Sequence, residues 1–522
     1  MQCAIGKRRN SGMPMRHFLL LISFSLVAGC ATTEFDYPKS ASFALTDTDD
    51  TFLARAFADA ISEHPPEQSG FYPVVDAIDS LALRLLLADR AERSIDAQYF
   101  LIHDDLVGNL FVRELLRAAD RGVRVRLLLD DIHVEGYDIG LAALDAHENF
   151  EVRIFNPFGH RKFRSLDVTR VGRITRRMHN KTFIADNQVA IVGGRNIADE
   201  YFGARQDEKF SDLDVVGIGS IVPEVSGMFD AYWNHAAAVP MPAIAEAPEN
   251  ADEALARVEN KIAKSLQDIE SSRYNDAVTS EILEFLQGSK GVLDWSTYDV
   301  VYDPPDKVNP DADADAGSIV VQMREAIGQV ERELYVVTPY FVLADENVEA
   351  FRRLRDRGVS MTVLTNSLAS NNHAISHSGY APVRKRLLEM GIDVYELRAS
   401  SSIPPDQSAG VQESKITLHA KAFAVDRNRL FIGSFNWNQR SSHLDTESGV
   451  IIYSTELAEQ LIEVVEAALP LHAFKVFLDE DDKLRWKGQD GGKEVILDHE
   501  PQSGFWRRFS AGFLRIAPNS QL

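Results

Sequence analysis

The segment Arg176-Arg-Met-His-Asn-Lys-Thr-Phe-Ile-Ala-Asp186 is the most informative part of the chain, because the second half carries a near-copy of it, His419-Ala-Lys-Ala-Phe-Ala-Val-Asp426. Each copy continues through a short apolar run into Gly-x-x-Asn, which ends at Asn196 in the first copy and at Asn436 in the second. His, Lys, Asp, Gly and Asn keep the same spacing in both. A pattern repeated at this length predicts two homologous halves.

Alternation explains why one residue separates His from Lys in each copy. Side chains two positions apart on a β-strand share a face, so His179 and Lys181, and likewise His419 and Lys421, are expected to point into one pocket. The apolar run after each Asp predicts a second, buried strand, and its Gly-x-x-Asn ending turns the chain so that the amide returns to the same pocket. Together the two half-sites offer two imidazoles, two ammonium groups and two amides.

Such a set of groups suits a phosphate diester. Lysine and asparagine side chains neutralise and hydrogen-bond the non-bridging oxygens as charge builds in the transition state. One imidazole attacks phosphorus while the other protonates the leaving alcohol, and this scheme needs no metal and no other cofactor. A single His-x-Lys is more often part of an ordinary exposed strand, whereas two full copies favour a catalytic pair.

These residues resemble the paired His-Lys-Asp signature of the phospholipase D superfamily, and the resemblance runs from about Pro73 to Tyr453. Further stretches resemble bacterial cardiolipin synthases, especially the type described as using phosphatidylethanolamine as donor; they are residues 121–131, 155–158, 192–197 and 364–368. One departure is Gly194, where the superfamily pattern usually has Ser, as the second copy has in Ser434. The resemblance implies one hydroxyl contact to phosphate fewer at Gly194, and it implies that Ser434 binds substrate together with the two asparagines.

The resemblance also implies an α/β protein of two similar α-β-α halves that pack side by side, with the active site in the seam between them. It implies a phosphatidyltransferase that makes cardiolipin from phosphatidylglycerol and a donor, phosphatidylethanolamine or phosphatidylglycerol, through a phosphatidyl-histidine. The nucleophile is assigned to His179 and the acid to His419. The catalytic set carried over from the signature is His179, Lys181, Asp186, His419, Lys421 and Asp426.

Composition bears on the alternatives to this function. A hydrolytic phospholipase D or a nuclease has the same motif, because fold and motif do not fix the substrate, and a membrane-tethered binding module with a relic site belongs to another class. The net charge of −23 argues against a nuclease and against nucleic acid as a partner, because duplex binding draws on a positive field. With 522 residues, 45% hydrophobic and 25% charged, the chain is folded and long enough for two or more domains.

A histidine nucleophile presents one nitrogen while its other N–H is held, usually by a buried carboxylate. The candidates are Asp212 or Asp214 after the first motif and Glu447 after the second, since each leads into an apolar strand. Which carboxylate serves which histidine stays open. Asp186 and Asp426 follow their lysines by an odd offset that puts them on the opposite face of the strand, so we expect them to fix the strand turn.

The N-terminus resembles a bacterial lipoprotein signal. Residues 7–17 are basic, residues 18–28 are apolar and too short to span a bilayer, and small residues precede Cys30. We expect cleavage before Cys30 and its acylation, which would anchor the protein in the bacterial envelope, facing the periplasm; Ala31, which is not Asp, favours the outer membrane. An uncleaved anchor is the alternative. Both cysteines of the chain lie in this region, so no disulfide or zinc framework is expected in the folded body.

Helical and strand patterns alternate from residue 81 and again from residue 318, which indicates β-α-β units around largely buried sheets. Segment 160–177 concentrates positive charge just before the first motif, and tail 505–516 places aromatic residues at helical spacing beside arginines. Both are candidates for contact with a phospholipid membrane, the alternatives being a solvated loop and docking onto the protein core. The expected organisation is a signal at 1–30, a tether with a lid helix at 31–70, a first domain at 71–239, a spacer without assigned chemistry at 240–317, a second domain at 318–470, and a C-terminal hairpin with a basic amphipathic tail at 471–522.

Overall fold

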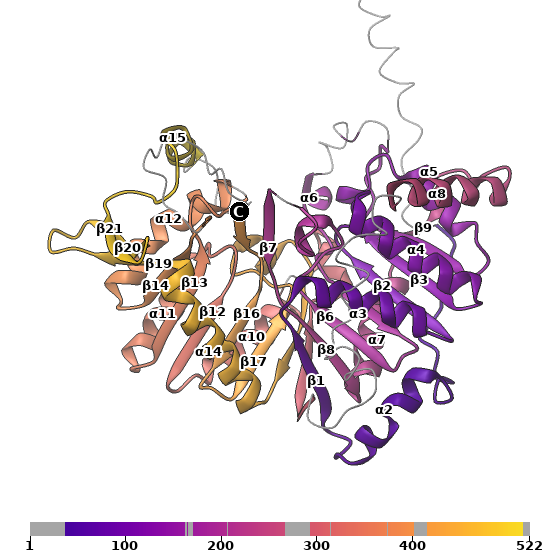
Figure 1. Ribbon diagram of the computed structural model, residues 1–522, viewed down its shortest axis with the longest axis horizontal. Helices are drawn as coiled ribbons and strands as arrows, with labels where there is room; N and C mark the ends of the chain where they lie inside the picture. Colours follow the sequence, from indigo (N-terminus) through magenta and orange to yellow (C-terminus); the bar gives the residue numbers. More distant parts are fainter. Residues whose placement is uncertain are drawn as a thin grey trace, which may run out of the picture.

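Two large sheets lie side by side, each with helices on its faces (Figure 1). The computed structural model describes residues 37–161, 164, 171–205, 207–266, 293–313, 315–372, 374–400 and 415–514. Each sheet has three parallel strands at its centre, joined on one side by three antiparallel strands. The second sheet repeats the arrangement of the first, which confirms the expected α/β fold of two homologous halves.

The strand order of each sheet shows the repeat. The first sheet runs β10 (Asp294–Ser296), β1 (Ser69–Val74), β8 (Asp214–Gly219), β6 (Val189–Gly193), β5 (Thr182–Ala185), β2 (Ser94–Tyr99), β3 (Arg124–Asp130), β4 (Phe150–Phe155) and β9 (Ala238–Pro240). The second runs β11 (Tyr298–Tyr302), β18 (Ser448–Ile452), β17 (Arg429–Gly433), β16 (Ala422–Val425), β12 (Glu333–Val337), β13 (Ser360–Asn366), β14 (Asp393–Leu397), β19 (Ala473–Leu478), β20 (Leu484–Asp490) and β21 (Lys493–Leu497). A small parallel pair, β7 (Glu208–Ser211) with β15 (Lys415–Leu418), joins the two halves.

Several helices start at side chains that accept hydrogen bonds from free backbone N–H groups, such as Asp76 before α3 and Ser454 before α14. Those of the first half and the segment after it are α2 (Phe52–Ser62), α3 (Ala77–Arg90), α4 (Leu106–Asp120), α5 (Asp138–Asp145), α6 (Val171–Ile174), α7 (Ile221–Asn234) and α8 (Ala251–Leu266). Those of the second half are α10 (Ile319–Gly328), α11 (Asp345–Asp356), α12 (Ala374–Glu389), α13 (Gln439–His443), α14 (Thr455–His472) and α15 (Phe505–Leu514). No helix within the described residues is both long and apolar enough to cross a bilayer.

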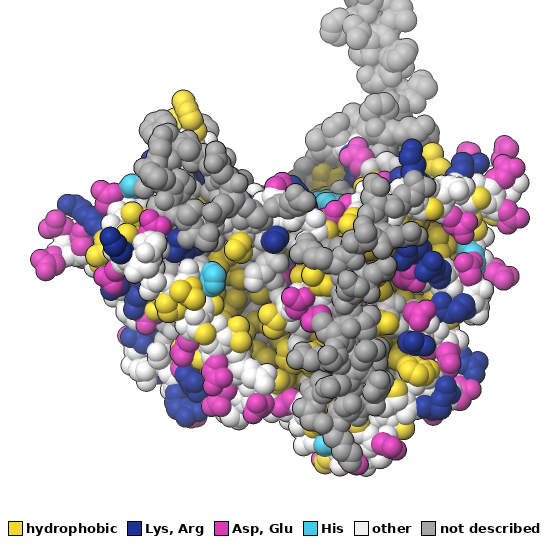
Figure 2. Space-filling view, viewed as in Figure 1, with side chains coloured by type: hydrophobic (Ala, Val, Ile, Leu, Met, Phe, Trp, Pro, Cys, Tyr) yellow, Lys and Arg dark blue, Asp and Glu magenta, His cyan; other side chains and the backbone are white. Residues whose placement is uncertain are grey.

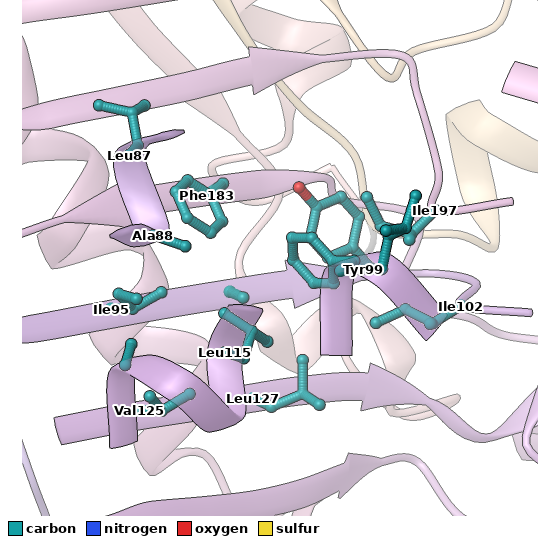
Figure 3. Packing of buried hydrophobic residues seen from close by; sticks show 14 of the residues in the cluster. Leu87, Ala88, Ile95, Tyr99, Ile102, Leu115, Val125, Leu127, Phe183 and Ile197 are labelled. Carbon is teal, nitrogen blue, oxygen red and sulfur yellow. The ribbon is translucent and has the colours of Figure 1, made fainter. Parts of the chain in front are cut away.

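The hydrophobic core has three parts, one of which belongs to both halves. In the first part Leu87, Leu115 and Phe183 pack together between the first sheet and helices α3 and α4 (Figure 3). A matching part lies against the second sheet. The third part joins residues of α7 and β6 to residues of α14 and β17, so the two halves bury one continuous apolar surface between them. On the face drawn in Figure 2, hydrophobic side chains accordingly gather between the halves and charged ones cover the outer parts.

Two expectations about connecting segments need correction. The expected spacer is part of both sheets where it is described, because β10 pairs with β1 and β11 pairs with β18. The expected C-terminal hairpin is three strands, β19 to β21, which extend the second sheet beyond β14. Apolar alternation predicts strands in these segments, but it does not say which sheet edge will accept them.

The expectation that the helix near the N-terminus acts as a lid is wrong. Helix α2 forms over the predicted residues, but it lies at the edge of the first half remote from α6 and β7 (Figure 1). The backbone N–H of Phe52 donates to Glu92, just before the amino end of β2. The preceding residues are not a loose tether either, since the N–H of Ala44 donates to Asp230 and the side chain of Arg126 donates to the carbonyl of Ser42. This segment is therefore part of the packed first half.

Candidate active site

Both His-x-Lys sequences lie in the seam at one edge of the molecule. His179 and Lys181 immediately precede β5, and His419 and Lys421 immediately precede β16. Strand β5 runs antiparallel to β2, and β16 antiparallel to β12, so the start of each motif strand meets the carboxyl end of a parallel strand. Open α/β sheets bind their ligands at that end. The repeat thus brings two half-sites to the same edge.

The backbone of each half holds the histidine of the other. The N–H of His179 donates to the carbonyl of Thr446 at 2.9 Å. On the other side the N–H of His419 donates to the carbonyl of Ser211 at 2.7 Å, where β15 ends beside β7. Each motif is therefore fixed at a point where the two halves exchange main-chain hydrogen bonds.

The carboxylates cross the seam in the same way. Nδ1 of His179 lies 2.9 Å from Oε2 of Glu447, and Nδ1 of His419 lies 2.5 Å from Oδ2 of Asp212. The carboxylate that follows each motif therefore holds the histidine of the other motif, an arrangement that the sequence left open. With Nδ1–H donated to a carboxylate, Nε2 is the nitrogen left for chemistry.

Asp214, the alternative to Asp212, does not meet a histidine. Its carboxylate accepts hydrogen bonds from Ser80 at 2.8 Å, Arg84 at 2.9 Å and Arg195 at 3.2 Å. This cluster is buried inside the first half. Asp214 is the first residue of β8, so its side chain points to the core, whereas Asp212 precedes the strand and reaches the seam.

Burial and like charge set the protonation of the site. Burial, with the charges of Lys181 and Lys421, lowers the pKa of His179 well below its ordinary value. Burial and Lys421 lower the pKa of His419 to about 3, against the opposing effect of Asp212. Burial also lowers the pKa of Lys181 to about 7 and that of Lys421 to about 8. A concentration of depressed pKa values in one seam is typical of a binding site for an anion.

The two carboxylates differ in their own protonation. Burial raises the pKa of Glu447 to about 7, although Lys181 opposes the shift. Burial also raises the pKa of Asp212, but the hydrogen bond to His419 and the charge of Lys421 outweigh it and leave the pKa below its usual range. Asp212 is therefore the more firmly ionised of the two, and the site is not symmetric.

The two asparagines lie in equivalent places with unfilled hydrogen-bonding capacity. Nδ2 of Asn196 lies 2.9 Å from the hydroxyl of Tyr201, and within the described part of the chain the buried amide oxygens of both Asn196 and Asn436 lack a partner. Buried polar atoms without partners favour a ligand. An amide exchanges its oxygen and nitrogen ends by a half-turn, so each position offers an N–H group to a phosphate oxygen.

Ser434 faces a carboxylate, which differs from the expected substrate contact. Its hydroxyl donates to Oε2 of Glu447 at 2.5 Å, and that of Ser441 donates to Oε1 at 2.5 Å. At the matching position of the first half, a Cβ on Gly194 would lie 2.2 Å from Oδ1 of Asp212. Glycine thus makes room for the closer carboxylate, and the departure from the family pattern concerns the carboxylates rather than the phosphate.

Asp186 and Asp426 lie at the far ends of their strands from the histidines, which removes them from the group expected to contact the substrate. Asp186 accepts from the N–H groups of Glu92, Arg93 and Ser94, and Asp426 does the same for residues 331–333. Each fixes the chain where a central parallel strand begins. This is the structural role that their odd offset indicated.

Aromatic rings surround both imidazoles. Phe210 stacks on His419 with ring centroids 5.3 Å apart, and Tyr201 meets the same ring edge-on at 5.0 Å. Phe100 meets His179 edge-on at 5.0 Å. Phe210 and Tyr201 were missed, because only the folded chain brings them across the seam to His419.

A buried ion pair from the expected spacer supports Glu447. Oδ2 of Asp303 accepts from the N–H of Glu447 at 2.9 Å and from Nζ of Lys307 at 2.9 Å. Nζ of Lys307 also donates to the carbonyl of Ser441 at 2.9 Å. Both side chains are buried. An Asp and a Lys at i and i+4 were the only sequence signal for this pair.

The basic segment before the first motif is mostly neutralised within the protein. Arg161 pairs with Asp131 and Asp138, and Arg164 also pairs with Asp131. Arg177 is buried and lies 3.3 Å from Asp130. The described arginines are therefore not a patch open to lipid, and the remainder of the segment, with Phe163 and Leu166, lies outside the described residues.

Known proteins share both the repeat and the length of this chain. The family model described as "Cardiolipin synthase, PLD-like domain" matches residues 86–233 and again 323–469. Cardiolipin synthase C of Escherichia coli (strain K12) is 37% identical over 483 residues, which cover 89% of this chain and 98% of that protein. An uncharacterised protein of Helicobacter pylori (strain ATCC 700392 / 26695) is 29% identical over 521 residues, 97% of this chain and 100% of its own. Phosphatidylserine synthase of Haemophilus influenzae Rd KW20 shares the fold with a TM-score of 0.54 and 13% identity, over 83% of this chain and 92% of its own.

Proposed function

The chain belongs to the family of cardiolipin synthases with phospholipase D-like domains and is a phospholipase D-type phosphatidyltransferase, and from this premise we propose that it makes cardiolipin by moving a phosphatidyl group onto phosphatidylglycerol. The observation that carries the proposal is the crossed pairing in the seam, His179 with Glu447 and His419 with Asp212, beside two buried lysines. Two aimed imidazoles and two cations meet the needs of a two-step displacement at a phosphate diester.

In the first step Nε2 of His179 bonds to the phosphorus of the donor phospholipid. The phosphorus–oxygen bond to the donor alcohol breaks, and His419 gives that oxygen its Nε2 proton. Lys181, Lys421 and the two asparagines hold the non-bridging oxygens as negative charge builds on them. The product of this step is a phosphatidyl-histidine and a free headgroup alcohol.

In the second step the glycerol hydroxyl of phosphatidylglycerol attacks the phosphatidyl-histidine. Its proton passes to His419, the phosphorus–nitrogen bond breaks, and His179 recovers its electron pair. The product is cardiolipin, and both imidazoles return to their starting state. The first step releases the headgroup of the donor, which is ethanolamine for phosphatidylethanolamine and glycerol for phosphatidylglycerol. The resemblance to cardiolipin synthases favours phosphatidylethanolamine as the donor.

The asymmetry of the carboxylates supports His179 as the nucleophile. A nucleophile must be neutral, and burial with nearby lysines lowers the pKa of both imidazoles. His179 faces Glu447, whose pKa is raised to about 7, so an imidazolium there has less support than one beside ionised Asp212. A general acid must hold a proton, and ionised Asp212 stabilises an imidazolium at His419 once an anionic diester has entered. This assignment gives each carboxylate a different task.

Contact with a lipid surface is the second part of the proposal. On α15, Trp506 is 74% exposed and Phe509 is 59% exposed. Arg507 of the same helix donates to the carbonyl of Leu368, beyond the carboxyl end of β13, so α15 stands at the active-site edge (Figure 1). Exposed aromatic side chains on an anchored helix suit a membrane interface. We further propose that Cys30, which lies outside the described residues, is acylated and tethers the chain in the cell envelope.

The test is mass spectrometry of lipids after incubation of the detergent-solubilised protein with phosphatidylethanolamine and phosphatidylglycerol, together and separately. Cardiolipin formed only with both lipids establishes the transfer and its donor, and cardiolipin from phosphatidylglycerol alone makes that lipid the donor. Phosphatidic acid without cardiolipin would make the protein a hydrolase. His179→Ala is the inactive control. A denatured, quenched reaction should carry phosphorus on His179, and phosphorus on His419 instead would reverse the assignment.

A further inference from the structure

A cavity of about 540 Å³ lies between α10, α11 and the loop that follows β17. Its volume is within the range of small-molecule binding sites. The wall residues from this part of the chain are Phe435, Trp437 and Asn438 of the loop and Ser442 and His443 of α13. Asn436 lies between two of these wall residues but is not part of the wall. The cavity is therefore next to the seam and separate from it.

The first half provides an internal comparison, because a buried charged cluster lies on the matching helix there. The repeat matches α3, which leads into β2, with α10, which leads into β12. Arg84 is buried beside Asp214 and lies over the ring of Phe202. Helix α3 also packs directly along α4.

In the second half smaller or apolar residues replace this cluster. Ser442 stands where the first half has Phe202, at the spacing of the two motifs, and Gly449 stands where it has Asp214, since Gly193 pairs with Asp214 as Gly433 pairs with Gly449. Met323 and Ser442 both line the cavity. The second half thus lacks the buried Arg–Asp cluster of the first, and the ring of Phe431 packs against Gly449 instead.

The walls are apolar below and cationic at the mouth. Met323, Phe351, Leu354 and Phe435 are buried, and the half-buried Trp437 has an indole N–H without a hydrogen-bond partner in the described chain. The rim carries the exposed residues Arg324, Arg353 and Arg357 against two acids, Asp315 and Glu346. On a chain with a net charge of −23, a rim with excess positive charge fits an anion.

We propose that this cavity binds one acyl chain of an anionic lipid, with the headgroup at the arginine rim and the chain against Trp437 and Phe351. A floor of aromatic and aliphatic side chains takes the hydrocarbon, and guanidinium groups take the carboxylate or phosphate. The occupant also touches the loop of Asn436 and the residues beside Ser441, whose hydroxyl holds Glu447. Binding is therefore expected to stiffen the wall of the active site from behind.

The experiment measures quenching of Trp437 fluorescence by bromine-labelled lipids in neutral-detergent micelles. Three probes are compared: dibromostearate, dibromo-phosphatidylglycerol and dibromo-phosphatidylcholine. The signal of Trp437 is the difference between the protein and its Trp437→Phe variant. We expect both anionic probes to quench it and the zwitterionic probe to quench it several-fold less. Quenching by dibromostearate alone would identify a free fatty acid as the source of the chain.

Neighbouring arginines on α11 give the matched control. Arg353 lines the cavity, whereas Arg352, one residue earlier, points elsewhere and pairs with Glu349. Arg353→Glu should weaken the binding of both anionic probes by about fivefold or more, and Arg352→Glu should leave it unchanged. Ala350→Phe, which fills the cavity without touching its charge, should abolish quenching in a protein with an unchanged Tm.

Two results would overturn the proposal: no quenching of Trp437 by any probe, or equal affinities in Arg353→Glu and Arg352→Glu. The test is run in parallel with His179→Ala protein, in which binding should persist. Because the cavity is separate from the seam, failure of the transferase reaction and failure of this site give distinguishable outcomes.

Discussion

At the residue scale, the two half-sites have diverged around their carboxylates. The first half has glycine at position 194 and presents the shorter Asp212, while the second has Ser434 and presents the longer Glu447. The residue at this position is thus a glycine where it adjoins the shorter carboxylate and a serine where it adjoins the longer one. A hydroxyl that holds Glu447 and a glycine that admits Asp212 produce the same result, a carboxylate oxygen within hydrogen-bond distance of Nδ1.

Gly194→Ala should therefore lower activity although the change is a single methyl group. The added Cβ would lie 2.2 Å from Oδ1 of Asp212 and would push that carboxylate away from His419. We expect the rate to fall by about a hundredfold, since a displacement of about 1 Å in a reacting group has that effect. Gly227→Ala is the control, because nothing lies within 4 Å of the added atom. Equal rates for both variants would refute the steric argument.

The depressed pKa values of the lysines predict a fall in activity on the alkaline side. Lys181 and Lys421, with pKa values of about 7 and about 8, carry their charge below those values and lose it as pH rises through them. The free enzyme then attracts the anionic diester less strongly, so kcat/KM should decline above about pH 8. The profile of kcat/KM from about pH 6 to about pH 10 checks this expectation. A flat profile up to about pH 9.5 would contradict it.

At the element scale, the sequence predicted the motif strands and the repeat but not the exchange between the halves. Apolar alternation and spacing are local, and they predict β5, β6, β16 and β17. The His-x-Lys residues were expected on the motif strands, but β5 and β16 begin only after Lys181 and Lys421. The crossing of Glu447 to His179 depends on where two sheets meet, which no local pattern contains. Helix α2 shows the same limit, because its periodicity gives a helix but not its position. The role of segment 303–308 was missed for that reason too.

The ion pair of that segment should matter for both stability and rate. Lys307→Met removes one partner of a buried pair and leaves Asp303 and the carbonyl of Ser441 without a cation. We expect a loss of about 3–5 kcal/mol in the free energy of unfolding, because breaking a buried pair leaves an uncompensated charge. Denaturant unfolding measures that loss. Lys475→Met is the matched control, since its pair with Asp393 is half exposed and should contribute at most about 1 kcal/mol.

Activity of the same variant separates positioning from stability alone. Under conditions in which both proteins are folded, Lys307→Met should react more slowly than the unaltered protein. Asp303 accepts a hydrogen bond from the N–H of Glu447, and the variant removes the cation that holds Asp303 in place. The acid side of its pH profile should also move, since the charge of Lys307 opposes the rise in the pKa of Glu447. A variant that is less stable but has the wild-type rate and pH profile would limit the pair to a structural role.

At the scale of the whole molecule, the shared core and the crossed bonds make the two halves one catalytic unit. The core that joins α7 to α14 fixes the seam, and α15 stands at the edge where the carboxyl ends of the parallel strands meet the two motifs. In the proposed contact with a membrane, the acidic chain and an anionic lipid surface repel each other, so apolar contact must supply the attraction. The exposed rings of α15 are suitably placed for that contact.

Trp506→Ser combined with Phe509→Ser should therefore weaken binding to vesicles of phosphatidylglycerol and phosphatidylethanolamine by at least about tenfold, because two exposed aromatic rings no longer enter the interface. The measurement is co-sedimentation in a Cys30→Ala background, which removes the proposed acyl anchor. Val464→Ser on α14 is the control, since Val464 is 56% exposed but belongs to another helix. Added salt should strengthen binding of the unaltered protein by screening the repulsion between its net charge and the lipid. If the double variant and the control bind alike, α15 does not face the membrane, and the active-site edge must reach its lipids through another surface.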